Sequence, residues 1–213
     1  MALMRSSRPA TKGRTSRDAA KSKTHSRITA AAGRLIRKKG LAAASVHEVM
    51  HAAGLTIGGF YAHFPSKTAM DAEVLSEALA EAREKWLKDI DHSRPSEWVA
   101  EVVKRYLNSS HRDRPDDGCP LPAVLSELAR SGRTTRRAVA EGLENYIKEF
   151  SAVAPQVEGV TPRERALATL ALCVGGVSIA RALHGYRISD ETLQACAKWA
   201  LPEREDTIGS SQG

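Results

Sequence analysis

Residues 45–67 read SVHEVMHAAGLTIGGFYAHFPSK, and this stretch carries the strongest local signals for the fold of the N-terminal part. Ser45, followed three residues later by Glu48, predicts a capping box at the start of a short helix. Gly54 ends that helix, because glycine readily adopts the left-handed backbone conformation that a sharp turn needs. Thr56 is a good cap for a second short helix immediately afterwards. The spacing therefore predicts two short helices joined by a tight turn, a helix-turn-helix.

Residues 47–51, HEVMH, also match the H-E-x-x-H motif of zinc peptidases. In that motif two histidines bind zinc and the glutamate activates a water molecule. The longer form of the motif requires a third histidine where this chain has Ile57, and no strand-like segment precedes the short helix to frame a substrate cleft. A zinc-dependent metallopeptidase is thus the weaker alternative. We expect His47 and His51 to point outward, with no metal, no cofactor and no catalytic residue.

The positive charge of the chain is concentrated at its N-terminal end. Residues 1–39 carry twelve Lys or Arg and one acidic residue, whereas the other 174 residues have a net charge of −4. Basic side chains gain affinity for nucleic acid by releasing the counterions condensed on phosphates. The uneven distribution predicts a polyanionic partner at this end, although a solvated basic arm would show the same composition.

The remaining composition indicates a cytoplasmic protein. The first 27 residues lack the apolar run of a secretory signal, and the longest stretch without Asp, Glu, Lys, Arg or His, residues 166–180, is shorter than the ~20 residues of a membrane span. The three cysteines have no metal-type spacing and are an odd number, which suits a reducing compartment. We expect no membrane contact.

Apolar residues recur with helical period along the chain, and no segment shows sustained alternation. The sequence therefore predicts an all-α fold, whose helices we place at residues 22–39, 45–53, 57–63, 66–90, 96–110, 121–130, 134–154, 162–184 and 190–201.

The stretch from Ser45 to Lys67 resembles the N-terminal helix-turn-helix of the TetR family of transcriptional repressors. The shared pattern is a short helix, Ala-Gly, an apolar residue, a polar cap, then aromatic-Tyr-x-His-Phe-x-x-Lys, and the similarity covers about residues 24–70. It implies a ligand-responsive transcriptional regulator, most simply a repressor, that binds double-stranded operator DNA as a homodimer and is released by a small-molecule effector.

The resemblance implies a three-helix DNA-binding domain joined by the fourth helix to a C-terminal helical domain for ligand binding and dimerisation. We divide the chain into a disordered basic arm (1–21), the helix-turn-helix domain (22–67), the effector-binding and dimerisation domain (68–203) and a disordered tail (204–213). The DNA-binding residues that the resemblance implies are Ser45, Val46, His47, Thr56, Ile57, Gly58, Gly59, Tyr61, His63 and Lys67.

The C-terminal part carries weaker signals. Small and apolar residues on the helix over residues 162–184 predict a dimer interface of Leu172, Gly175, Gly176, Ile179, Ala180 and Leu183. Candidate walls of a pocket for an apolar or aromatic effector are Trp86, Trp98, Tyr106, Cys119, Tyr146 and Phe150. Each pocket residue suits an ordinary core position too, and Cys119 is either a structural residue or a reactive thiol.

Overall fold

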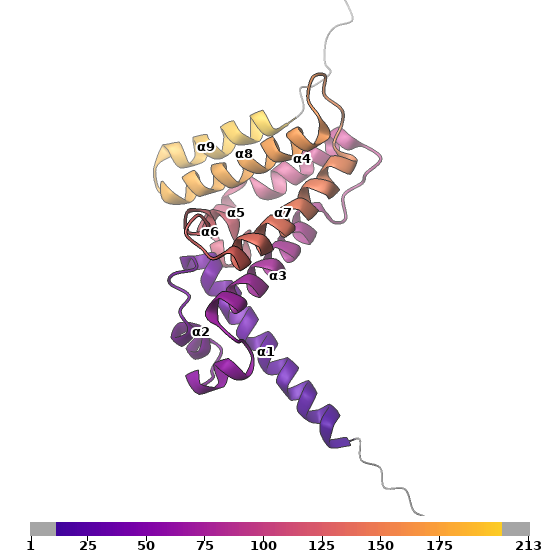
Figure 1. The fold of residues 1–213 in the computed structure, drawn as a ribbon. Helices are drawn as coiled ribbons and strands as arrows, with labels where there is room; N and C mark the ends of the chain where they lie inside the picture. The colour runs from indigo at the N-terminus through magenta and orange to yellow at the C-terminus, as the bar shows by residue number, and fades with distance from the viewer. Residues whose placement is uncertain (1–11, 202–213) are drawn as a thin grey trace, which may run out of the picture.

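The computed structural model describes residues 12–201, and this part of the chain forms helices and no strand, which confirms the all-α prediction (Figure 1). The α-helices are α1 (Lys12–Lys39), α2 (Val46–Ala52), α3 (Lys67–Leu87), α4 (Pro95–Tyr106), α5 (Ser109–Asp113), α6 (Leu121–Leu128), α7 (Arg133–Val153), α8 (Pro162–Ala182) and α9 (Arg187–Ala200). Two short 3-10 helices complete the set, η1 (Ile57–Ala62) and η2 (Pro115–Asp117).

Helix α1 is longer than predicted. It begins at Lys12, so residues 12–21, which we expected to belong to a disordered arm, are helical. Extending an existing helix adds a hydrogen bond for each residue fixed, and this segment contains good helix formers such as Ala19, Ala20 and Lys21. The rest of the predicted arm, residues 1–11, and the predicted tail, residues 204–213, lie outside the described residues.

The first three helical elements and the start of α3 share one core, which we call the head. Its centre is made of side chains with at most 1% exposure, Ile28 and Ile36 from α1, Val49 and Met50 from α2, Phe60 from η1, Phe64 from the following turn and Met70 from α3. In Figure 1 the N-terminal half of α1 runs diagonally away from this core, with α2 beside its C-terminal half. The head is therefore a small group of helices around one core, with the N-terminal half of α1 projecting from it.

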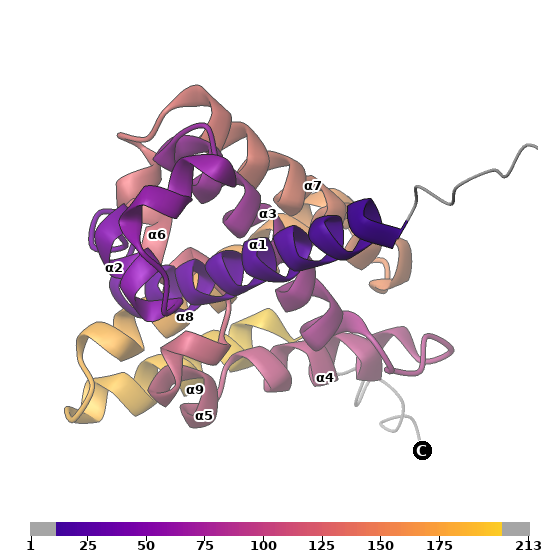
Figure 2. The same ribbon diagram turned by 90° about the horizontal axis from the view of Figure 1, so that it is seen from below.

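Helix α3 connects the head to the remaining helices. It starts in the head and packs along α7 within the C-terminal part of the chain, whose core includes Trp98 and Phe150 at 0% exposure. Helices α8 and α9 pack against each other at the top of Figure 1, away from α2. In Figure 2, which is seen from below, α1 crosses in front of the other helices. Helix α8 is also the one described helix that is long and apolar enough to cross a membrane, yet it packs against both α7 and α9.

The helix predicted at residues 96–110 is interrupted. Helix α4 ends at Tyr106, and α5 starts at Ser109 because the Asn108 side chain accepts a hydrogen bond from the His111 backbone N–H at 2.8 Å. Asparagine is favoured at such caps, where its side-chain oxygen replaces a helical acceptor. The break turns the chain towards α8 and places His111 at the junction of several helices.

Candidate nucleic-acid interface

The predicted turn between the two short helices is present, and local interactions fix its shape. The Ser45 hydroxyl accepts from Glu48 N at 3.2 Å, so Ser45 caps α2 as expected, while the Glu48 carboxylate lies 3.7 Å from Lys39 Nζ. Gly54 has φ of +66°, the left-handed conformation that the sequence predicted. Arg27 of α1 adds a contact that the local pattern does not reveal, because its Nη2 donates to Ala53 O at 2.7 Å.

The second short helix differs from the prediction in type. Residues 57–62 form the 3-10 helix η1, with Gly59 N donating to Thr56 O at 3.1 Å, in place of the α-helix expected over residues 57–63. A segment this short that contains Gly58 and Gly59 has low α-helical propensity, which explains the tighter winding. The Thr56 side chain makes no capping hydrogen bond and is exposed.

Several of the predicted DNA-binding residues present open surface on η1. Tyr61 is 71% exposed and Ile57 is 49% exposed, which is unusual for large apolar side chains. A Cβ atom on Gly58 would have no neighbour within 4 Å, so another molecule can approach this backbone closely. Gly59 is less open, since its Cβ would lie 3.7 Å from Met50 Cε. Phe60 between them is fully buried and anchors η1 to the head.

The start of α2 adds to this surface. His47 and His51 are both exposed, with their rings stacked at 6.4 Å, while Ser45 and Val46 are half-buried. Among the residues that the structure describes, no third His, Cys, Asp or Glu joins the two histidines in a group that could hold a metal ion. The pair therefore lacks the further ligand that a zinc peptidase needs, and the geometry gives that alternative no support.

Two predicted contacts are directed inward. Lys67 Nζ donates to Leu41 O at 3.0 Å and to the Asp71 carboxylate at 2.7 Å, one helical turn further along α3. His63 is half-buried, and burial, together with the positive charges of His25 and Lys21, lowers the pKa of its imidazole. At neutral pH both groups are thus less suited to attract phosphate than the sequence suggested, and we assign Lys67 to holding the loop after α1.

Basic residues in the N-terminal half of α1 are exposed and have no acidic partner among the described residues. Arg17, Lys21 and Lys23 are exposed, and within residues 12–201 none of them has a carboxylate partner within 4 Å. Positive charge on a projecting helix suits the phosphate backbone of a duplex. The described part of α1 therefore extends the polar surface of α2 and η1 with cationic side chains.

One contact in the head comes from far along the chain. Glu127 on α6 accepts hydrogen bonds from Leu41 N at 3.0 Å and Ala42 N at 2.6 Å, in the loop between α1 and α2. A sequence separation of 85 residues leaves no local signal for this pairing. It ties the loop that orients α2 to the C-terminal part of the chain.

The predicted dimer residues fall on two faces of α8. Gly176 and Ala180 pack inward within the single chain, since a Cβ on Gly176 would meet Leu107 Cδ2 at 2.9 Å and Ala180 is 0% exposed, so we leave them out of the proposed interface. Leu172 and Leu183 are half-buried. Gly175 and Ile179 do lie on the open face, as does the small residue Ala171 of the same helix. Apolar residues that we did not predict lie there too, Leu167 on α8 and Ile188 and Trp199 on α9.

The predicted pocket residues form two aromatic clusters inside the C-terminal part. Trp86 packs against Tyr106 at 5.2 Å, and Trp98 and Tyr146 pack against Phe150 at 5.2 and 5.8 Å. Of the six residues, Trp86 and Trp98 border the two clefts described below. Tyr106, Cys119 and Phe150 are core residues, and Tyr146 is partly buried against that core. Cys119 is buried, and burial raises the pKa of its thiol, which favours the structural role over the reactive one.

Comparisons with known proteins agree with this geometry. Residues 28–74 match the family described as bacterial regulatory proteins, tetR family. An uncharacterized HTH-type transcriptional regulator of Bacillus subtilis (strain 168), YerO, is 25% identical over 148 residues, which are 60% of this chain and 51% of that protein. The match therefore spans about half the length of this relative.

Solved structures share the fold over most of the chain. A TetR-family transcriptional regulator from Agrobacterium tumefaciens has a TM-score of 0.70 at 20% identity, covering 85% of this chain and 100% of that one. AibR, whose structure is described as a complex with isovaleryl coenzyme A and operator DNA, has a TM-score of 0.62 at 16% identity, covering 84% of this chain and 98% of that one.

The family match covers α2, η1 and most of the head core, the regions that the turn at Gly54 organises. It is a family of regulatory proteins and not of zinc peptidases. Residues 28–74 of this chain are therefore a helix-turn-helix domain of the tetR family of bacterial regulatory proteins, and most of the chain shares its fold with solved regulators of that family.

Proposed function

We propose that this protein is a ligand-responsive repressor that binds operator DNA as a homodimer. The observation that carries the DNA-binding part is the exposure of η1 directly after the Gly54 turn. Tyr61 and Ile57 are held in the open by the buried Phe60, beside a Gly58 backbone with free space around it. Such a rigid, projecting segment fits the major groove, where side chains contact base edges and the backbone lies close to phosphates.

Different residues of this surface suit contacts to bases and contacts to phosphates. Ile57 can contact the methyl group of a thymine, whereas Tyr61 and His47 offer donors to phosphate oxygens. The cationic side chains of α1 contribute affinity that depends on salt and little on sequence. Thr56, at the start of η1, is exposed and its hydroxyl makes no capping bond, so it too is available to DNA.

The open apolar face of α8 and α9 supports the dimer in this proposal. Ile179 is 48% exposed, Leu167 is 42% exposed and Trp199 is 78% exposed, on two helices that pack side by side. Contiguous exposed apolar residues on a helix pair are typical of an isologous interface. Dimerisation through this face, at the end opposite to the head, would carry two heads into successive major grooves about one helical turn, ~34 Å, apart.

Regulation by a ligand is supported by the contacts that join the head to the C-terminal part. Glu127 holds the Leu41–Ala42 backbone from α6, and Lys67 holds Leu41 O from the start of α3. A ligand that favours one position of α3 or α6 over another would therefore change the orientation of α2 and η1. AibR, a protein of similar fold described in complex with isovaleryl coenzyme A and operator DNA, supports this part of the proposal.

We also place the protein in the cytoplasm, where its DNA target lies and where its three free cysteines stay reduced.

A binding titration tests the DNA-binding part of the proposal. The full chain is added to a labelled fragment taken from the DNA directly upstream of its own gene, and a shuffled fragment of equal length and composition is the control. We expect tighter binding to the upstream fragment and a steep loss of affinity as salt is raised. Equal affinity for the two fragments at every salt concentration would exclude a specific operator there.

A reporter assay tests the direction of regulation. The same upstream fragment drives a reporter gene in cells with and without the protein, and repression predicts lower output when the protein is present. Higher output in its presence would make the protein an activator and would contradict the repressor assignment.

A further inference from the structure

We propose that a small aromatic carboxylate is the effector, and that it binds in a cleft between the C-terminal ends of α3 and α4 and the start of α5. The inference deepens the ligand response proposed above and rests on it. The cleft has a volume of about 170 Å³, and its lining includes Lys85, Trp86, Arg105, His111, Arg114 and Asp117. Pockets for drug-sized ligands have roughly 300–1,000 Å³. This one therefore suits a molecule with a single ring.

The charge of the cleft favours an anion. Three cationic side chains and one carboxylate line it. Lys85 pairs with Asp117 at 2.9 Å, and Arg105 pairs with Glu101 at 3.1 Å. Arg114 donates to the Ser110 hydroxyl, and in the described part of the chain no carboxylate lies within 4 Å of it. A planar guanidinium without a carboxylate partner binds a carboxylate ligand through two parallel hydrogen bonds.

A buried donor points to the same class of ligand. Trp86 is 6% exposed and lines the cleft, and its indole Nε1 has no hydrogen-bond partner among the described residues. Buried polar groups are nearly always paired, because an unpaired one loses its interaction with water and gains nothing in return. An indole N–H can only donate. The Nε1 atom itself is closed to solvent, so a ligand in the cleft pairs with it only if the Trp86 side chain shifts on binding, and the atom that then accepts is of the kind that a carboxylate oxygen provides.

The aromatic part of the ligand is indicated by the rings at this site. The Trp86 and His111 rings lie 4.7 Å apart, and Lys85 Nζ lies 5.3 Å from the Trp86 ring centre. Burial lowers the pKa of His111 to about 4, so its ring is neutral at physiological pH and adds flat surface without repelling an apolar ring. A carboxylate attached to one aromatic ring matches both the cations and these faces.

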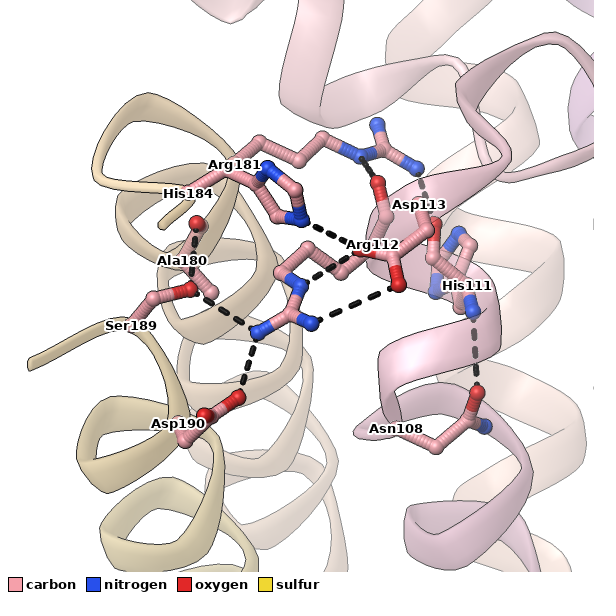
Figure 3. A network of polar contacts seen from close by, with 9 residues as sticks. All are labelled: Asn108, His111, Arg112, Asp113, Ala180, Arg181, His184, Ser189 and Asp190. Atoms are coloured by element: carbon pink, nitrogen blue, oxygen red, sulfur yellow. Dashed lines mark hydrogen bonds and ion pairs between the residues drawn. The ribbon is translucent and has the colours of Figure 1, made fainter. Parts of the chain in front are cut away.

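The cleft lies between a fixed wall and the elements that reach the head. Arg181 of α8 donates to His111 O at 2.7 Å, and Arg112 donates to Ser189 at the start of α9 at 3.0 Å, which holds α5 on the α8–α9 corner (Figure 3). Helix α5 is thereby attached to the two helices whose open face we assign to dimerisation. We therefore take α5 as the side of the cleft that stays in place when a ligand binds.

The side of the cleft that faces α5 is formed by α3, which connects the cleft to the head. Lys85 and Trp86 belong to α3, which begins in the head at Lys67. Cys119 N donates to His111 Nε2 at 3.1 Å, just before α6, and α6 carries Glu127 to the loop after α1. A ligand placed between α5 and α3 would change their separation. The change would reach Leu41 through Lys67 at the start of α3 and through Glu127 on α6.

A second, larger cleft does not fit an anion. It has about 330 Å³ and lies between the end of α3 and α4, where Asp91, Glu97 and Glu101 outnumber Arg94 and Lys104. Arg94 is exposed and paired with Glu97 at 2.9 Å, so replacing it provides a matched control at a site outside the proposed one.

Calorimetric titration of the full chain with benzoate, phenylacetate and cinnamate tests the proposal, with the corresponding neutral amides as controls. We expect at least one carboxylate to bind with saturation at one site per chain, and its amide to bind at least roughly tenfold more weakly. Arg114→Gln and Trp86→Phe should each weaken binding by roughly tenfold, while Arg94→Gln leaves it unchanged. Thermal melting of each variant establishes that it is folded, and Arg114 is exposed, so its replacement leaves the core intact.

The outcomes separate this inference from the proposed function. If none of the three carboxylates binds, or if the amides bind equally well, the ligand assignment is wrong even when the chain binds its upstream DNA. If a carboxylate binds and Arg94→Gln abolishes it while Arg114→Gln does not, the site assignment is wrong. If a carboxylate binds as predicted but the wild-type chain does not bind DNA, the site stands and the proposed function fails.

Discussion

The Glu127 carboxylate on α6 accepts hydrogen bonds from two consecutive backbone N–H groups, those of Leu41 at 3.0 Å and Ala42 at 2.6 Å. The loop that contains them follows α1 and positions α2. Because Gly40 leaves α1 with φ of +84° and lies against the same carboxylate, this loop is held by one side chain of the C-terminal part. The contact joins the loop of the head directly to α6 of the C-terminal part.

Replacing Glu127 with Ala should therefore both destabilise the protein and weaken DNA binding. The substitution removes the acceptor of two N–H groups. Leu41 is buried, and an unpaired buried donor costs about 1–3 kcal/mol, whereas the exposed Ala42 N–H can bond to water instead. The free energy of unfolding is obtained from urea denaturation, and DNA affinity from the upstream-fragment titration. Glu141→Ala is the matched control, since Glu141 is exposed and pairs only with Arg137 one turn away. Equal stability of the two variants would show that the Glu127 contact contributes nothing.

The two glycines of the helix-turn-helix should respond differently to alanine. Gly54→Ala places a side chain at φ of +66°, which costs about 1–2 kcal/mol, and the free energy of unfolding should fall by that amount. Gly58 lies in open space, so Gly58→Ala should keep the stability of the wild type and lose DNA affinity instead. Chemical denaturation and DNA titration of both variants check this contrast. A Gly54→Ala variant as stable as Gly58→Ala would contradict the role of the turn.

The helix-turn-helix was largely predictable from sequence, because its signals are local. The Ser45 cap and the Gly54 turn each depend on residues within a few positions. The 3-10 winding of η1 was missed because Gly58 and Gly59 weaken α-helical propensity without changing the apolar pattern. The orientation of Lys67 was missed for a related reason, since its ion pair with Asp71 competes with the phosphate contact that the motif suggests.

The long-range features could not be predicted. Glu127 and Leu41 are 86 positions apart, and nothing in either neighbourhood indicates the other. On α8, Gly175 and Gly176 are adjacent small residues, yet one faces open space and the other packs on Leu107 and Cys196. Composition alone cannot separate the interface face from the packing face, because the rotation of a helix depends on its neighbours.

The dimer should be disrupted by charge on the open face of α8. Ile179 is 48% exposed in the single chain, so Ile179→Arg should fold normally but place two like charges in a two-fold interface. Analytical ultracentrifugation should show a dimer for the wild type and a monomer for the variant. Leu125→Arg is the control, because Leu125 is 45% exposed on α6, and it should remain dimeric. A dimeric Ile179→Arg protein would place the interface elsewhere.

His111 should make the stability of the protein depend on pH in the acidic range. Burial lowers its pKa from 6.5 to about 4, so the unfolded chain takes up a proton at pH values where the folded chain does not. The stabilisation is complete above pH 6.5 and is lost as pH falls towards 4, by about 3 kcal/mol in total.

Urea denaturation at several pH values between 7.5 and 4.5 measures this loss. His111→Gln should be less stable at pH 7.5 and should flatten the curve between pH 6.5 and 4.5 relative to wild type, because the titrating group is gone. His47→Gln, at an exposed position, should follow the wild-type curve. If His111→Gln lost stability on acidification as steeply as the wild type, His111 would not be the group responsible.

We propose that the exposed residues of η1 bind DNA, and Tyr61 is the most exposed large side chain on this helix, so its replacement is the sharpest check. Tyr61 and Tyr186 are each 71% exposed, but Tyr61 lies on η1 and Tyr186 lies in the turn between α8 and α9. In fluorescence anisotropy with the upstream fragment, Tyr61→Ala should weaken binding by roughly tenfold, equivalent to about 1.4 kcal/mol, while Tyr186→Ala binds as the wild type does. If Tyr61→Ala binds the fragment with wild-type affinity, η1 is not the DNA-binding segment.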